Sequence, residues 1–285
     1  MTALRQFTYQ GHTIGKGTDT HVITVQGLSA LPVLSSDIER LGDGQFAGSD
    51  RYTGRTITFT TELRPHNDDD LDTQRAALVD AWQVGGGRTE TALEFQIPGV
   101  AGGGLRRIYC RPRGGAGVTV DRQFTIGRAR ETFQMHATDP RIFDANQTVV
   151  SLQIEDDSGE GLTWPLTWPL DWGQAADGNT AVIDNTGNTV TPLSVTFTGA
   201  VQSPTLQNVT TGESFTVLQS LDAGATLEVD TGAGTVLLGG VASRFASLAT
   251  GSVLFDLSPG VNVLRFSGIG VGATAVVSFR SAWLA

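Results

Sequence analysis

Residues 55–63, Arg-Thr-Ile-Thr-Phe-Thr-Thr-Glu-Leu, alternate between two kinds of side chain. Ile57, Phe59 and Thr61 fall on one face of an extended segment, and the intervening threonines fall with Glu62 on the other. A period of two residues is typical of a β-strand, in which successive side chains point to opposite faces. The stretch therefore predicts a strand with one face toward a core, and it places the chain among mainly β proteins.

One helix is expected directly after this strand, over about residues 68–83. Its first turn is rich in carboxylates, which are favourable there because the backbone N–H groups are unpaired. These carboxylates are Asp68, Asp69, Asp70 and Asp72. The apolar residues at helical spacing are Leu71, Leu78, Val79 and Trp82. Three glycines at 85–87 follow, so the helix is expected to end there.

Short strands are expected on both sides of the helix in the first half of the chain. The segments with strand character are residues 21–26, 91–96, 105–111, 118–121 and 131–137. Residues 41–54 are rich in glycine and aspartate and predict a long loop. At 285 residues the chain is longer than a typical single domain, so a first domain is expected over residues 1–150.

The second half contains short strands about ten residues apart, with turn signals between them. Seven or eight such strands without a helix are typical of a β-sandwich, which is expected as a second domain over residues 177–285. An acidic segment and a tryptophan–proline segment come before it. Together they predict a linker over residues 151–176.

Three tryptophans recur every four residues in that linker, at Trp164, Trp168 and Trp172. Pro165 and Pro169 favour an extended chain, in which this spacing puts the three indoles on one face. We expect the indoles to anchor the domain junction, because a linker must be held if two domains are to keep a fixed relation. The alternative is an aromatic face that stacks sugars, as in carbohydrate-binding modules.

The formal net charge is −10 at pH 7 and the sequence pI is about 4.8. Nucleic acid is not expected as a partner, because its negatively charged phosphate backbone would repel an acidic protein. Cys110 is the single cysteine, which excludes an intrachain disulfide and is compatible with a reducing compartment. Residues 1–10 show no signal-peptide pattern, and no apolar run is long enough to span a membrane.

No residue pattern in the chain predicts catalysis. The four histidines lie at no metal-ligand spacing, and no G-x-S-x-G nucleophile elbow occurs. The glycine-rich segments 100–105 and 268–272 lack the strand–loop–helix context of a phosphate-binding loop. The acidic clusters at 68–72 and 155–160 match no calcium loop. We therefore expect a protein that is not an enzyme, with no catalytic residue, no cofactor and no metal ion.

Several short motifs follow one another in an informative order. The first half holds Tyr52-Thr53-Gly54-Arg55 before the alternating strand and closes on Ala137-Thr138-Asp139-Pro140. The motifs of the second half are Asn185-Thr186-Gly187-Asn188, Thr191-Pro192, Leu227-Glu228-Val229-Asp230 and Pro259-Gly260-Val261-Asn262. In this order the motifs resemble the distal tail proteins of long-tailed bacteriophages, a family of siphovirus-type minor tail proteins.

The resemblance implies a structural virion protein of the tail tip, assembled in the cytoplasm of the host bacterium. Its N-terminal domain would be a partly open β-barrel with one helix, and its C-terminal domain a galectin-like, jelly-roll β-sandwich. The chain would form a homohexameric ring of the baseplate hub, which joins the tail tube protein to the tail tip or tail-associated lysin hub protein. Tape measure and receptor-binding proteins are further partners that the resemblance suggests. The alternative function is a carbohydrate-binding adhesion module that contacts the host surface.

A ring needs complementary surfaces on neighbouring subunits. Residues 105–113, Leu-Arg-Arg-Ile-Tyr-Cys-Arg-Pro-Arg, form a basic strand within an acidic protein. From charge contrast alone, we expect this strand to face the acidic start of the helix across the interface between subunits. The residues of this candidate ring interface are Asp68, Asp69, Asp70, Arg106, Arg107 and Arg111.

Overall fold

The alternating stretch forms β8 (Arg55–Leu63), which lies within the large sheet of the first of two units. The computed structural model describes residues 5–64, 68–84, 87, 89–119, 127–154, 178–270 and 272–285. One unit comprises Met1–Ala145 with Trp283–Ala285, and the other comprises Asn146–Ala282. The expected linker falls mostly on residues 155–177, which lie outside the described residues, and its first residues belong to a strand of the second unit.

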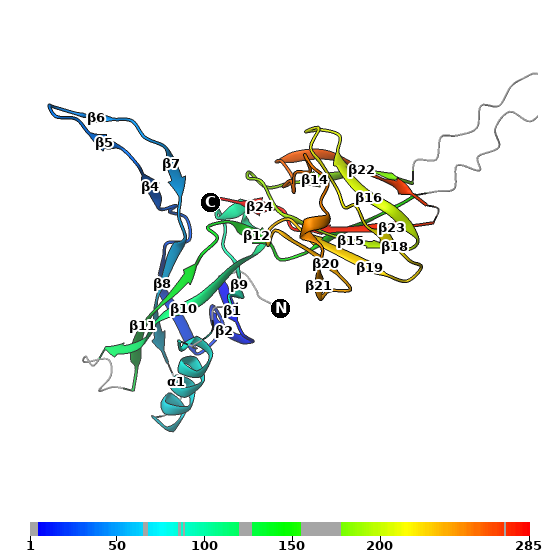
Figure 1. The fold of residues 1–285 in the computed structure, drawn as a ribbon. Helices are drawn as coiled ribbons and strands as arrows, with labels where there is room; N and C mark the ends of the chain where they lie inside the picture. The colour runs from blue at the N-terminus through cyan, green and yellow to red at the C-terminus, as the bar shows by residue number, and fades with distance from the viewer. Residues whose placement is uncertain are drawn as a thin grey trace, which may run out of the picture. The chain divides into compact units, whose positions relative to one another are not determined.

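The first unit is built on one open antiparallel sheet (Figure 1). The strand order is β2-β1-β9-β10-β11-β8-β3, with β12 paired to β10 and β24 paired to β12. The remaining bounds are β1 (Gln6–Tyr9), β2 (His12–Gly15), β3 (Thr20–Gln26), β9 (Thr91–Gln96), β10 (Leu105–Thr119), β11 (Ala129–Ala137), β12 (Ile142–Asp144) and β24 (Ala282–Trp283), with a 3-10 turn at Ala101–Gly103. β2 and β3 are the two ends of this order, so the sheet does not close into a barrel.

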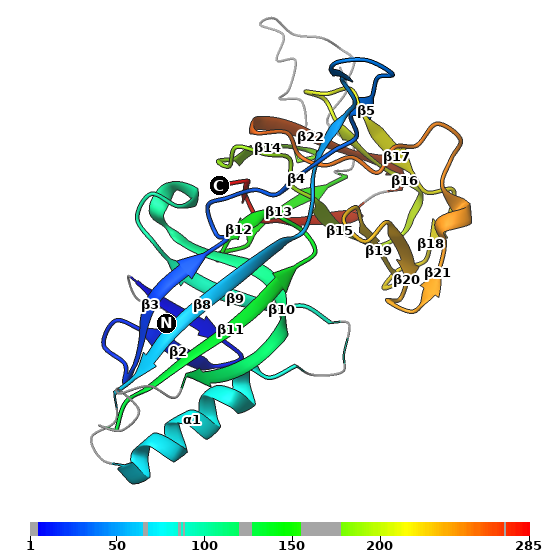
Figure 2. The same cartoon turned by 90° about the vertical axis from the view of Figure 1, so that its left-hand side faces the viewer.

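The predicted helix is α1 (Asp68–Trp82), and it packs on one face of the sheet (Figure 2). Its apolar stripe is confirmed at Leu71, Leu78 and Trp82, which are buried, whereas Val79 is only half-buried. The Trp82 ring lies 5.4 Å from the Phe59 ring and 4.6 Å from the Phe133 ring, centroid to centroid. Burying one large apolar side chain stabilises a fold by about 2–3 kcal/mol, so this cluster holds the helix against β8 and β11.

The two faces of β8 differ as the alternation predicts, with one exception. Ile57, Phe59 and Thr61 are buried, and Thr56 on the other face is exposed. Glu62, which the pattern placed on the outer face, is buried. It lies among arginines, 3.2 Å from Arg64 and 3.6 Å from Arg128, and these charges make its burial tolerable.

A two-stranded arm extends between β3 and β8, away from the sheet of the first unit (Figure 1). Its strands are β4 (Val33–Ser35) paired with β7 (Asp50–Tyr52), and β5 (Ile38–Glu39) paired with β6 (Gln45–Phe46). The prediction of a long loop over residues 41–54 was wrong, because β6 and β7 lie within it. Among the described strands, those of the arm pair only with one another.

The second unit contains two antiparallel sheets around one core. Their orders are β13-β23-β15-β19-β20-β21 and β14-β22-β16-β17, with β18 paired to β16. The bounds are β13 (Thr148–Gln153), β14 (Thr180–Asn185), β15 (Leu193–Thr198), β16 (Val201–Asn208), β17 (Ser214–Thr216), β18 (Ser220–Leu221), β19 (Thr226–Asp230), β20 (Thr235–Leu238), β21 (Ala242–Ser243), β22 (Gly260–Ile269) and β23 (Thr274–Phe279), with a 3-10 turn at Phe245–Ser247. Phe197 and Phe266 meet across the core with ring centroids 5.4 Å apart. The predicted β-sandwich is confirmed.

Candidate assembly interface

Arg106 on β10 has its partners inside the first unit. One guanidinium nitrogen lies 2.6 Å from the Asp144 carboxylate, and Nε donates to the Ala101 carbonyl oxygen at 2.7 Å. The guanidinium also lies 3.8 Å over the ring of Trp283. Burial lowers the pKa of Arg106, and Asp144 opposes that shift. With these contacts, Arg106 holds β10, β12 and the end of the chain together.

Arg107 is also paired within the chain. It stands opposite Glu94 in the register of β9 and β10, and its guanidinium donates to that carboxylate at 2.7 Å. Such a partly exposed pair contributes at most about 1 kcal/mol to the free energy of unfolding. The interface role expected for Arg106 and Arg107 stays a prediction, but the charges of both are already compensated within the protomer.

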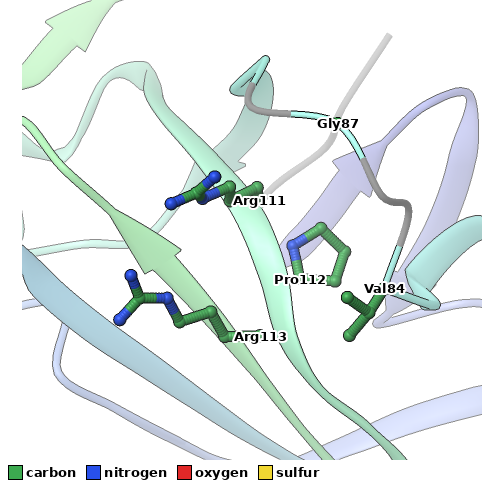
Figure 3. A pocket seen from close by; sticks show the side chains of 5 residues that line it. All are labelled: Val84, Gly87, Arg111, Pro112 and Arg113. Carbon is green, nitrogen blue, oxygen red and sulfur yellow. The ribbon is translucent and has the colours of Figure 1, made fainter.

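Arg111 and Arg113 lie further along β10 and line a surface pocket of about 320 Å³. Their side chains extend to the same side of the strand, whereas Pro112 points toward Val84 on the other (Figure 3). Neither arginine has an ion-pair partner among the described residues, and the buried Nε of Arg111 has no hydrogen-bond partner there. At these two arginines, no described carboxylate pairs with the charge of the basic strand. Arg111 was predicted as part of the candidate interface, and Arg113 was not.

His136 on β11 lies beside these arginines. The register places it opposite Arg111, and its Nδ1 lies 3.3 Å from the Thr56 hydroxyl. Burial lowers the pKa of His136, and Arg113 and Arg111 lower it further, while Glu90 acts in the opposite direction. The imidazole is therefore neutral near pH 7, and the positive charge of this region comes from the arginines.

The acidic residues of the candidate interface lie at the first turn of α1. Asp68 and Asp69 begin the helix, and their side chains lie outside the described part of the structure. Asp70 is half-buried and Asp72 is exposed. The pocket includes Val84, just beyond the last residue of the helix, so the two charged groups lie at opposite ends of α1. A helix of 15 residues is about 22 Å long, so they do not meet within one chain.

The arm presents an apolar surface that the sequence analysis missed. None of its strand residues is buried. Its exposed large apolar residues are Val33, Leu34, Ile38, Leu41, Phe46 and Tyr52. Ile38, for example, exposes 68% of its surface. The available signal was the recurrence of apolar residues within a stretch that its glycines and aspartates otherwise marked as a loop.

Arg55 fixes the root of this arm. Its side chain is fully buried and donates to the carbonyl oxygens of Leu28, Pro140 and Leu284, the last at 2.6 Å. Burial lowers the pKa of Arg55 to about 10, and Asp139 opposes that shift. The residue remains cationic at neutral pH, so three carbonyl dipoles surround a buried positive charge. The motif that ends on Arg55 gave no indication of these partners.

The described residues hold no group of three or more His, Cys, Asp or Glu side chains that could bind a metal ion. Cys110 is buried, and burial raises the pKa of its thiol. Within the described part of the chain, no helix has the length and apolar character needed to cross a membrane. The candidate junction anchor Trp164, Trp168 and Trp172 lies outside the described residues, so its role stays a prediction.

The second unit matches a known family of phage proteins. Residues 186–283 match the model of the siphovirus-type tail component, C-terminal domain. No curated protein matches the chain significantly.

Solved structures with the same fold come from phages. SPP1 Dit (gp 19.1), described as a paradigm of the hub adsorption apparatus in phages that infect Gram-positive bacteria, aligns with a TM-score of 0.65 at 15% identity over 97% of this chain and 98% of its own. The phage P2 baseplate in its activated conformation with Ca aligns with a TM-score of 0.54 at 11% identity. The form with Sr aligns with a TM-score of 0.53 at 10% identity. Both comparisons cover 97% of this chain and 98% of the other. At these identities the likeness shows the fold.

The family match and the fold agree with the order of motifs along the chain. The resemblance to distal tail proteins is thereby confirmed: residues 186–283 match the model of the siphovirus-type tail component, C-terminal domain, and the chain as a whole has the fold of SPP1 Dit.

Proposed function

We propose that this protein is a structural, non-enzymatic subunit of a phage baseplate hub, which forms a homohexameric ring between the tail tube and the tail tip. The family match of the second unit and the fold of the whole chain support its place in a tail. The observation that carries the proposed assembly is the exposed apolar arm of the first unit.

The arm is a surface that requires a partner. A two-stranded ribbon is at best marginally stable in water, and its strands pair with no other described strand. Its exposed apolar side chains form the kind of patch that marks a protein interaction site. The nine residues from Val33 to Leu41 reach about 30 Å when extended, far enough to lie across a neighbouring subunit. Repeated around an axis, such a contact closes a cyclic ring.

Three serine substitutions in the arm test this proposal. The combined variant Leu34→Ser, Ile38→Ser and Phe46→Ser removes exposed apolar surface and leaves the core intact. The matched control carries Val149→Ser, Val182→Ser and Val261→Ser, which remove three exposed valines from the second unit. Light scattering after gel filtration should show rings for the wild type and the control, and monomers for the arm variant. An arm variant that assembles like the wild type contradicts the role of the arm.

The proposed ring has partners on both sides. The tail tube protein would dock on one side, and the tail tip or tail-associated lysin hub protein on the other. Tape measure and receptor-binding proteins are further proposed partners. The ring would act at the tail tip of the virion after assembly in the cytoplasm of the host bacterium, without nucleic acid or a cofactor as ligand.

A carbohydrate-binding role has less support. In the described part of the second unit, Phe245 is the one exposed aromatic side chain, and an aromatic face for sugars needs more than one ring. The three tryptophans that motivated this alternative lie outside the described residues. The structural role is therefore preferred.

A further inference from the structure

We propose that Arg111 and Arg113 of one copy bind the carboxylates in the acidic first turn of α1 from the next copy. The inference rests on the proposed ring and names side chains that join its subunits. The inference is based on two charged groups of opposite sign. Within the protomer they are separated by the length of one helix.

The receiving surface is the pocket of about 320 Å³ on β10. Its two arginines extend side by side (Figure 3), and neither has a carboxylate partner among the described residues. The buried Nε of Arg111 also lacks an acceptor there, although a buried donor without a partner is costly. The planar guanidinium matches a carboxylate geometrically, so an acidic segment supplies the acceptors that this pocket lacks.

The donated surface is the acidic first turn of α1, formed by Asp68, Asp69, Asp70 and Asp72. Asp72 is exposed and has no ion-pair partner among the described residues. Arg75, one turn further along the helix, does not neutralise this group, because its Nε binds Glu131 at 2.7 Å. Asp72 therefore presents negative charge at the start of α1.

The positions of the two groups determine how copies can associate. The acidic turn begins α1, and Val84 of the pocket lies two residues beyond the end of the helix. Two groups about 22 Å apart cannot pair within a chain, but they can pair between chains arranged head to tail. A head-to-tail contact uses different surfaces on the two subunits and builds a ring when the rotation closes.

Charge reversal tests the contribution of the pocket. Arg111→Glu with Arg113→Glu should raise the protein concentration needed for half-assembly by about tenfold or more. Arg5→Glu with Lys16→Glu changes the net charge equally at exposed positions away from the pocket and should assemble like the wild type. Adding Asp69→Arg and Asp72→Arg to the pocket variant should restore assembly. A pocket variant that assembles like the control overturns the inference and leaves the proposed ring intact.

Chemical crosslinking tests the pairing directly. Gly115→Cys places a thiol beside the pocket, where a Cβ meets no other atom, and Asp72→Cys places one at the acidic turn. Cys110 does not compete, because it is buried. With a short bismaleimide, a mixture of the two single variants should give a crosslinked dimer, and either variant alone should give none. A chain with both substitutions should give a ladder that extends beyond the dimer. If the protein assembles but gives no crosslink, this inference is wrong and the proposed ring stands. If the wild type stays monomeric, both the inference and the proposed ring are wrong.

Discussion

The guanidinium of Arg55 donates a 2.6 Å hydrogen bond to the carbonyl oxygen of Leu284, 229 residues further along the chain. It also donates to the carbonyl oxygens of Leu28 and Pro140. Leu28 and Arg55 lie on the two sides of the arm, so one buried cation ties the root of the arm to the last residues of the chain. These hydrogen bonds join four segments of the first unit at one buried side chain.

Removing this cation should destabilise the first unit. Arg55→Met keeps most of the side-chain volume but leaves three carbonyl groups without their donor, one in a buried hydrogen bond and two in part-buried ones. We expect the free energy of unfolding to fall by roughly 3 kcal/mol, measured by urea denaturation. The control Arg51→Met alters an exposed arginine of the arm and should change it by less than about 0.5 kcal/mol. Equal unfolding midpoints for the two variants would show that Arg55 does not hold the root.

Substitutions at Gly11 and Gly27 distinguish the cost of backbone strain from the cost of a steric clash. Gly27 has φ of 86°, and a Cβ there would lie 2.0 Å from the Thr56 carbonyl oxygen. Gly11 has φ of 82° with no atom within 4 Å of such a Cβ. Gly11→Ala should lower the free energy of unfolding by about 1–2 kcal/mol, because alanine is strained in a left-handed backbone conformation. Gly27→Ala should cost at least about 2 kcal/mol more, because the backbone must also move. Thermal unfolding of both variants checks this order, and a reversed order would contradict it.

The contact between α1 and the sheet depends on Trp82. Trp82→Ala removes a fully buried ring that packs on Phe59 and Phe133, and it should lower the free energy of unfolding by about 3–5 kcal/mol. Hydrogen exchange should show the loss of protection first in α1. The control Val84→Ala, at an exposed position just after the helix, should leave protection unchanged. Unaltered exchange in α1 of the Trp82 variant would contradict this packing.

Glu62 should give the first unit a specific sensitivity to acid. A hydrogen bond from Arg64 lowers the pKa of Glu62, burial opposes this, and the charges of Arg64 and Arg128 lower it further. Its stabilising effect is therefore complete above the ordinary glutamate pKa of 4.5 and is lost as the pH falls through the lower folded value. Because Arg64 is partly exposed, the effect should stay within about 1 kcal/mol.

Comparing Glu62→Gln with the wild type measures this effect. Between about pH 3 and 7, the urea midpoint of the variant should depend less on pH than that of the wild type. Glu213→Gln, at an exposed carboxylate of the second unit, is the control and should follow the wild type. Parallel profiles for the Glu62 variant and the wild type would contradict the shift.

The sequence predicted elements whose signal is local. The alternation in residues 55–63 and the stripe from Leu71 to Trp82 each arise from one element packing on a core, so β8 and α1 were found. The sandwich of the second unit followed from short strands and regular turns. The burial of Glu62 was not predicted, because it depends on the charges of Arg64 and of Arg128, which directly precedes β11. Alternation along a single strand does not show such partners.

The candidate interface was less predictable because it depends on partners distant in sequence. Nothing local showed that Arg106 would bind Asp144 or that Arg107 would stand opposite Glu94, since both contacts come from strand register. The arm was missed for a different reason. Its apolar side chains cover no core of this chain, so they show none of the periodicity by which strands are recognised.

Native mass spectrometry of the wild-type chain at tens of micromolar tests the central claim most directly. The proposed hexameric ring of 30.0 kDa subunits predicts a dominant species of about 180 kDa with no larger open series. A spectrum that holds only the 30.0 kDa monomer, or an unbounded ladder of oligomers, would contradict the closed ring.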